Sequence, residues 1–137
     1  MVQNVFSSVS DAGSELTDWV KGAKNIVVLS GAGVSAESGV PTFRDAHTGF
    51  WQNYDVEQLA TADAWDADPS LVYSWYLWRA RMVRSVDPNP GHVAIAAWEE
   101  HANVFVSTQN VDDLHERAGS QKVSHLHGSL YTLCCDE

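Results

Sequence analysis

Polar residues that could do chemistry are concentrated in three short runs. Residues 31–44 read GAGVSAESGVPTFR and directly follow the apolar segment 25–30. Because glycine has no Cβ, backbone N–H groups of such a turn can approach phosphate oxygens, and the N-terminus of a following helix favours negative charge. Residues 108–112 read TQNVD and residues 125–129 read HLHGS. These runs indicate a phosphate-binding cleft that also holds amides, a carboxylate and histidine.

The glycine spacing alone does not decide this chemistry. It departs from the G-x-G-x-x-G pattern of common dinucleotide-binding turns, and an isolated GAG is also typical of an ordinary tight strand-to-helix turn. The loop expected from residue 36 to about 54 favours a functional role, because loops of this length inside compact domains are usually functional.

Apolar periodicity predicts an α/β domain. Strands are expected at residues 24–30, 103–107 and 123–126, and helices at 14–21, 55–86, 92–100 and 113–118. The alternation of strands and helices predicts a parallel sheet with helical crossovers. We therefore expect a lead-in at 1–20, a Rossmann-like portion at 21–54 and 89–137, and a helical insertion lobe at 55–88.

Length and composition limit the class of protein. The 137 residues suit one domain, and 45% hydrophobic residues with a mean hydropathy of −0.21 can build a core. A net charge of −10 and a pI of about 4.8 argue against a nucleic-acid binder, which would show a basic face. No apolar run approaches the roughly 18–20 residues of a membrane span, and residues 1–6 lack the pattern of a signal peptide. We expect a cytoplasmic protein with neither nucleic-acid nor membrane partners.

Several polar positions fall at the ends of predicted strands. Ligands of parallel α/β sheets bind beyond the carboxyl ends of the strands, so Ser30, Thr108 and His127 are expected to border one cleft. The ordinary pKa of histidine suits proton transfer near neutral pH, which makes His127 a candidate general base. Chemistry alone does not exclude His125 from this role, since it lies two residues earlier on the same predicted strand.

The residues after the second predicted strand offer hydrogen-bonding groups. Gln109, Asn110 and Asp112 can bind a carboxamide and the hydroxyls of a ribose. Asparagine and aspartate also cap helices, so Asp112 has the alternative role of capping the helix expected near Asp113.

Taken together and in this order, the three runs resemble the sirtuins, the NAD-dependent protein-lysine deacylases. The resemblance covers the N-terminal part of that family's catalytic core. It implies NAD as cofactor, acylated lysines of proteins as substrates, and nicotinamide, free lysine and O-acyl-ADP-ribose as products. It also implies catalytic roles for Asn110 and for His127 as general base. The implied cofactor-binding residues are Gly31, Ala32, Gly33, Glu37, Thr42, Phe43, Arg44, Asp45, Trp51, Gln109, Asn110 and Asp112.

The expected helical lobe carries Tyr76 and Arg79, which share a helix face because they are three residues apart. A phenol and a guanidinium placed together could bind a carboxylate. Among sirtuins, this Y-x-x-R pattern resembles the branch that removes succinyl and malonyl groups, and Ala60 matches the small residue that widens its acyl pocket. The alternative is an aromatic core stripe with solvent-facing arginines, of which Arg81 and Arg84 are further examples.

Cys135 follows His127 by eight residues, where the resemblance implies the first cysteine of a structural zinc module. Such a site requires four ligands, so only its start is present in this sequence, and Cys134 is a bystander. A disulfide between these adjacent cysteines would be strained.

The sheet is expected to be incomplete, with an unpaired edge and exposed apolar surface that favour self-association. This expectation leaves a second interpretation open, in which the chain is a non-catalytic module that binds NAD or ADP-ribose or docks on a partner. A third interpretation, an ordinary NAD(P) oxidoreductase, is less favoured because no acidic residue clearly follows the second strand to bind a ribose in the usual Rossmann manner.

Overall fold

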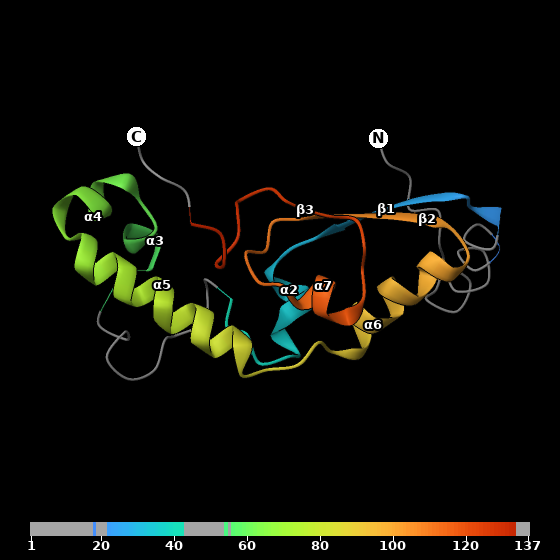
Figure 1. Cartoon of the computed structure of the whole chain (residues 1–137), viewed down its shortest axis with the longest axis horizontal. Coiled ribbons are helices and arrows are strands. Elements are labelled where there is room, and N and C mark those ends of the chain that lie inside the picture. The colour runs from blue at the N-terminus through green and yellow to red at the C-terminus, as the bar shows by residue number, and fades with distance from the viewer. Residues whose placement is uncertain (1–17, 19–21, 43–53, 55, 134–137) are drawn as a thin grey trace, which may run out of the picture.

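The computed structural model describes residues 18, 22–42, 54 and 56–133 of the chain (Figure 1). Within these residues the predicted α/β architecture is confirmed, with a parallel sheet in the order β1-β2-β3. The strands are β1 (Asn25–Ser30), β2 (Asn103–Thr108) and β3 (Val123–His125). The helices are α2 (Ala32–Ala36), α3 (Val56–Leu59), α4 (Ala62–Ala67), α5 (Pro69–Arg84), α6 (Pro90–Ala97), the 3-10 helix η2 (Trp98–Glu100) and α7 (Leu114–Ala118).

The register of the sheet brings the strand ends together. Strand β1 pairs with β2 from Asn25 opposite Asn103 to Ser30 opposite Thr108. The side chains of the last pair meet, because the Ser30 hydroxyl donates to Oγ1 of Thr108 at 2.9 Å. Strand β3 continues the order, with His125 opposite Thr108. The carboxyl ends of all three strands therefore lie at the same edge, as the sequence predicted.

Helices α2, α6 and α7 lie on one side of the sheet (Figure 1). On that side Val104 and Val106 are buried, whereas Val27 and Leu29 on the other side are 66% and 80% exposed. The prediction of a buried first strand is therefore wrong for β1, which alternates between half-buried and exposed residues. In the described part of the chain, helices cover only one face, and this leaves the expected apolar surface exposed.

The helical block predicted for 55–86 is divided into three helices by side-chain caps. Oγ1 of Thr61 accepts a hydrogen bond from the backbone of Ala64 and begins α4. A carboxylate oxygen of Asp68 accepts one from Leu71, and Pro69 supplies the first turn of α5. Figure 1 shows α3, α4 and the start of α5 away from the sheet.

Helix α6 begins two residues earlier than the predicted start at His92, because Asn89 caps it. The Asn89 side-chain oxygen accepts from the backbone of Gly91 and His92, and the His92 ring accepts from the backbone of Asn89. The Asn89 amide also donates to the backbone oxygen of Val34 at 2.7 Å and to the hydroxyl of Ser38 at 3.0 Å. This residue thus joins α6 to the segment that follows β1.

The core nearest the strand ends joins α5, α7 and the segment after α2. Its buried members are Val40, Val83 and Leu114. Arg117 on α7 reinforces this junction, since its guanidinium donates to the backbone oxygens of Val83 at 3.2 Å and Val86 at 2.6 Å. The C-terminal end of α5 is therefore held against α7.

A second, smaller core lies in the helical lobe, where Leu59 packs on the fully buried ring of Trp75. The helix predicted for 14–21 falls almost wholly outside the described residues. No helix of the described part has the length and apolar character needed to cross a membrane.

Replacing Leu114, which is fully buried, with alanine is expected to lower the free energy of unfolding by about 2–5 kcal/mol, because the cavity left between α5 and α7 is not refilled. Urea denaturation followed by circular dichroism measures this change. The matched control is Leu77→Ala on α5, where the side chain is 52% exposed and the expected change is below about 0.5 kcal/mol. Equal losses for the two variants would contradict the assignment of this core.

Candidate functional site

A cavity of about 150 Å³ lies at the carboxyl edge of the sheet, between the segments that follow the strands and helix α5. Residues from all three polar runs border it, so these runs share one cleft. Of the three strand-end positions expected at the cleft, His127 lines it, whereas Ser30 and Thr108 do not. The side chains of Ser30 and Thr108 instead hydrogen-bond to each other, and Thr108 is fully buried. Its lining residues are Ala32, Ser35, Val40, Pro41, Arg79, Val83, Gln109, Asn110, Val111, Asp112, His127 and Leu130.

The floor of the cavity is held together by a buried hydrogen-bond network centred on Ser35. The Ser35 hydroxyl donates to a carboxylate oxygen of Asp112 at 2.9 Å, and the Asn110 amide donates to Ser35 at 3.1 Å. The other carboxylate oxygen of Asp112 accepts from the backbone of Leu114, which begins α7. The N-cap of α7 is Asp113, so Asp112 is not the cap itself, but it accepts from the first N–H of the helix and borders the cavity as well.

The glycine turn borders space that the described part of the chain does not fill. Gly31 has an extended backbone, with φ −146° and ψ −171°, and a Cβ added at Gly31 or Gly33 would meet no atom within 4 Å among the described residues. Neither position therefore needs glycine for a tight turn or for packing within this structure. Because first-turn N–H groups of a helix lack intrahelical partners, the turn before α2 presents donors beside open space. This arrangement favours a ligand over an ordinary structural turn.

The two candidate histidines have different surroundings. His127 borders the cavity, and its exposed ring makes no hydrogen bond with any described residue. His125 lies outside the cavity lining, where its ring contacts the backbone oxygen of Asn110 and the carboxylate of Glu116, each at 2.7 Å. The predicted strand 123–126 ends at His125, and His127 follows in a turn. The geometry therefore favours His127 as the group that meets a ligand.

Two further histidines are buried behind the strand ends. The rings of His92 and His115 lie 4.9 Å apart, and Nε2 of His115 contacts the hydroxyl of Ser30 at 2.9 Å. Burial lowers the pKa of His92, and burial together with the neighbouring His92 ring lowers the pKa of His115. Both rings are thus kept neutral and serve the packing beneath the site.

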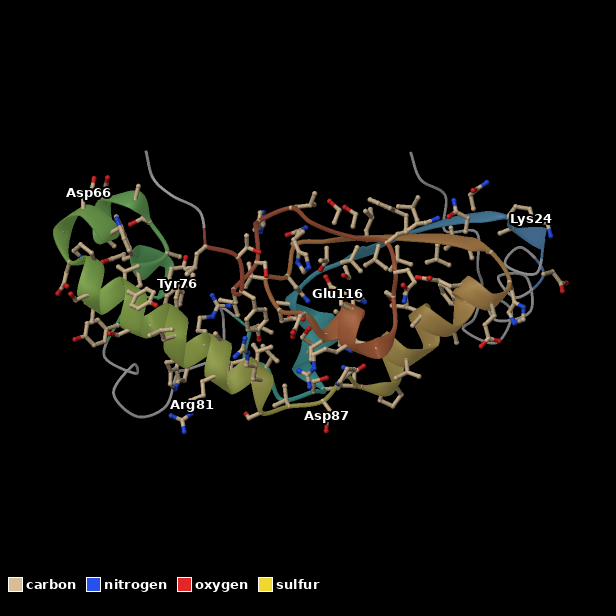
Figure 2. The ribbon with its side chains drawn as sticks, viewed as in Figure 1. Lys24, Asp66, Tyr76, Arg81, Asp87 and Glu116 are labelled. Atoms are coloured by element: carbon tan, nitrogen blue, oxygen red, sulfur yellow. The ribbon has the colours of Figure 1, made fainter. Side chains whose placement is uncertain are left out.

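Helix α5 brings Arg79 to the cavity, but Tyr76 and Ala60 are not among the residues that line it. The Arg79 guanidinium lies 4.9 Å from the centre of the Trp75 ring, and Tyr76 packs edge-on against the same ring at 4.8 Å. Burial lowers the pKa of Arg79, and the neighbouring Tyr76 and Asp112 oppose this shift. Tyr76 is 38% exposed part-way along α5 (Figure 2), and Ala60 lies in the exposed turn between α3 and α4.

The remaining predicted residues do not line the cavity or lie outside the described residues. Glu37 is exposed at the C-cap of α2, and Thr42 is half-buried after Pro41. The predicted positions Phe43, Arg44, Asp45, Trp51 and Cys135 lie outside the described residues. In the part of the chain that is described, no three His, Cys, Asp or Glu side chains gather in a way that could hold a metal ion.

Sequence reasoning did not identify Ser35 as a site residue. Its hydroxyl is the only polar side chain between Gly33 and Glu37. Because a buried polar group requires hydrogen-bond partners, this isolated serine was the feature that could have indicated the network. The apolar lining, including Val40, Val83 and Leu130, was not predicted because these residues converge from different parts of the chain.

The family model described as Sir2 family matches residues 31–137 of this chain. The chain belongs to the Sir2 family. It is 58% identical over 111 residues to the NAD-dependent protein deacylase Sir2 of Mycolicibacterium smegmatis, covering 81% of this chain and 46% of the relative. It is 59% identical over 110 residues to the NAD-dependent protein deacylase of Mycobacterium tuberculosis, covering 80% and 46%.

The structure also matches solved Sir2 proteins. A Sir2 homolog in complex with NAD superposes with a TM-score of 0.77 at 49% identity, over 85% of this chain and 45% of that chain. The Rossmann-like fold of the Sir2 family is thereby established for the described sheet and helices. The chain spans about half the length of the curated relatives that it matches.

Proposed function

We propose that this Sir2-family chain binds NAD at the carboxyl edge of its sheet and acts in the NAD-dependent removal of acyl groups from protein lysines. The observation that carries the proposal is the cavity itself, in which Ala32 of the glycine turn, Asn110, Asp112 and His127 border one space. The names of the relatives, NAD-dependent protein deacylases, support the same reaction.

The residues present fit the parts of a dinucleotide. The open turn at Gly31 and Gly33 suits a pyrophosphate, since no described residue fills the space where their side chains would be. The exposed Gln109 amide and the cavity-lining Asn110 suit a carboxamide and ribose hydroxyls. When bound, NAD supplies a ribose carbon from which nicotinamide can depart, so that the acyl oxygen of the substrate can bond to that carbon.

The protein's own side chains are proposed to position the ligand and to remove a proton from it. The buried Ser35 network fixes Asn110 and Asp112 before any ligand arrives, so the cost of ordering these side chains is already met in the folded state. His127 is proposed as the general base that takes a proton from a ribose hydroxyl, because its ring borders the cavity and has no competing partner among the described residues. The proposed products are nicotinamide, free lysine and O-acyl-ADP-ribose.

Arg79 is proposed to select acidic acyl groups such as succinyl and malonyl. It lines the cavity and stacks on Trp75, so its guanidinium is oriented before a carboxylate binds. Tyr76 is proposed to assist from the same helix, since its ring and the Arg79 guanidinium both pack on the Trp75 ring. Partial burial strengthens the attraction of the guanidinium for a carboxylate, because less water screens it.

The phosphate-binding role of the turn is tested by Gly33→Ala. The new Cβ meets no atom of the residues that the structure describes, and alanine is favoured over glycine in a helix by about 1 kcal/mol, so stability is expected to hold or rise. Crowding of a bound phosphate costs about 1–3 kcal/mol, so calorimetry should show ADP-ribose binding roughly tenfold weaker. Gly22→Ala, at the opposite end of β1 and equally open, is the control and should bind ADP-ribose normally. Unchanged affinity in Gly33→Ala would refute the assignment of the turn.

The reaction itself is tested by His127→Ala. Loss of a general base is expected to lower the deacylation of an acyl-lysine peptide by about 10²–10⁴-fold, while NAD binding persists. Mass spectrometry of the peptide and chromatography of released nicotinamide follow the two products separately. His101→Ala, an exposed histidine at the end of η2, is the control and should keep wild-type turnover. If the unaltered protein binds NAD without releasing nicotinamide, a non-catalytic binding module is the correct function.

The proposed acyl preference predicts that Arg79→Met lowers kcat/KM for a succinyl-lysine peptide by about 10²-fold, because a bound carboxylate would lose its charge-assisted partner. The same change should lower deacetylation by less than about threefold. Arg81→Met, an exposed arginine of α5, is the matched control for both substrates. Equal losses with the two acyl groups would instead indicate a folding defect.

A further inference from the structure

His125, the last residue of β3, contacts two hydrogen-bond acceptors at once. Its Nδ1 lies 2.7 Å from the backbone oxygen of Asn110, and its Nε2 lies 2.7 Å from Oε1 of Glu116 on α7. A backbone oxygen can only accept a hydrogen bond, so Nδ1 carries a proton. An ionised carboxylate can only accept as well, so Nε2 also carries one. The two contacts together select the doubly protonated, positively charged ring.

Asn110 is the residue that this ring restrains. Its backbone N–H donates to Oγ1 of Thr108 at 3.0 Å, and its side-chain amide donates to Ser35 at 3.1 Å. The contact from His125 restrains the backbone oxygen of Asn110 as well. Asn110 is therefore fixed by partners on β2, α2 and β3 while it borders the cavity.

We propose that His125, paired with Glu116, is a positioning residue that fixes Asn110 at the cavity and makes this restraint depend on pH. Loss of the Nε2 proton leaves a lone pair facing the Glu116 carboxylate at 2.7 Å, so an attraction becomes a repulsion. The ring then loses its hydrogen bond to Glu116, and its restraint on the backbone oxygen of Asn110 weakens. The inference rests on the proposed function for the identity of the ligand, but the link between His125 and Asn110 does not.

The surroundings of the ring agree with this assignment. Burial by itself lowers the pKa of His125, but the hydrogen bonds to Asn110 and Glu116 and the charges of Glu116 and Asp112 outweigh it, so the pKa is raised above 6.5. The adjacent His115 stays neutral in its buried position, and the two rings disfavour each other's charge. Because the folded-state pKa is raised, the stabilising contribution of His125 is complete below pH 6.5 and is lost as the pH rises through the raised pKa.

The link is tested by NMR titration of the whole chain between about pH 6 and about pH 9. The His125 ring and the backbone amide of Asn110 are expected to titrate with one shared midpoint above 6.5. Glu116→Gln keeps the size of this exposed side chain and removes its charge, so both midpoints should shift together to lower pH. Glu100→Gln, another exposed carboxylate at the end of η2, should leave both midpoints in place. An Asn110 signal that does not follow the His125 ring would overturn the proposal.

The consequence for binding is measured with ADP-ribose as the probe. If deprotonation leaves about 10–30% of molecules with Asn110 correctly placed, the apparent Kd rises about three- to tenfold as the pH passes the His125 midpoint. His125→Gln, which cannot titrate, should abolish this step, whereas His101→Gln should retain it. A step that persists in His125→Gln would overturn the proposal. Absence of ADP-ribose binding at every pH, with Asn110 still following His125, would refute the proposed function and support the positioning role.

Discussion

The geometry of the cleft depends on the hydrogen bonds made by the hydroxyl of Ser35. This hydroxyl joins α2 to Asn110 and Asp112, residues 75 and 77 positions further along the chain. Breaking these two hydrogen bonds would leave the Ser35 hydroxyl, the Asn110 amide and one carboxylate oxygen of Asp112 without these partners. Each buried polar group left unsatisfied costs about 1–3 kcal/mol. Because Asp112 also accepts from the backbone of Leu114, the same network fixes the start of α7. The segments after β1 and β2 therefore keep one relative position, and the cavity between them is preformed.

Much of this fold could be predicted because its determinants are local. The apolar runs of β1 and β2 and the helix stop at Gly119, which has a φ of 114°, are read directly from residue types. The early start of α6 is also determined locally, since asparagine followed by proline is a common beginning of a helix. The exposure of β1 could not be predicted, because it depends on which faces of the sheet the helices cover.

The histidines show why the site was harder to predict than the fold. His92 and His115 are buried and neutral, His125 bridges a backbone oxygen and a carboxylate, and His127 borders the cavity. One side-chain type thus has three different electrostatic environments within a short stretch of the sheet edge. The family motif favours His127, which the structure places at the cavity, but the partners of His125 come from α7 and from the end of β2. Only tertiary structure brings such groups together.

The two ends of helix α5 have different contacts. Arg117 holds its last turn, whereas its first turns carry the small core around Trp75 in a lobe away from the sheet (Figure 1). Its 16 residues make a rod about 24 Å long, so a swing of about 10° about the pinned end displaces the far end by about 4 Å. Arg79 lies only five residues from that end and would move about 1 Å. The position of Arg79 at the cavity is therefore much less sensitive to the orientation of α5 than is the position of the lobe at the far end of the helix.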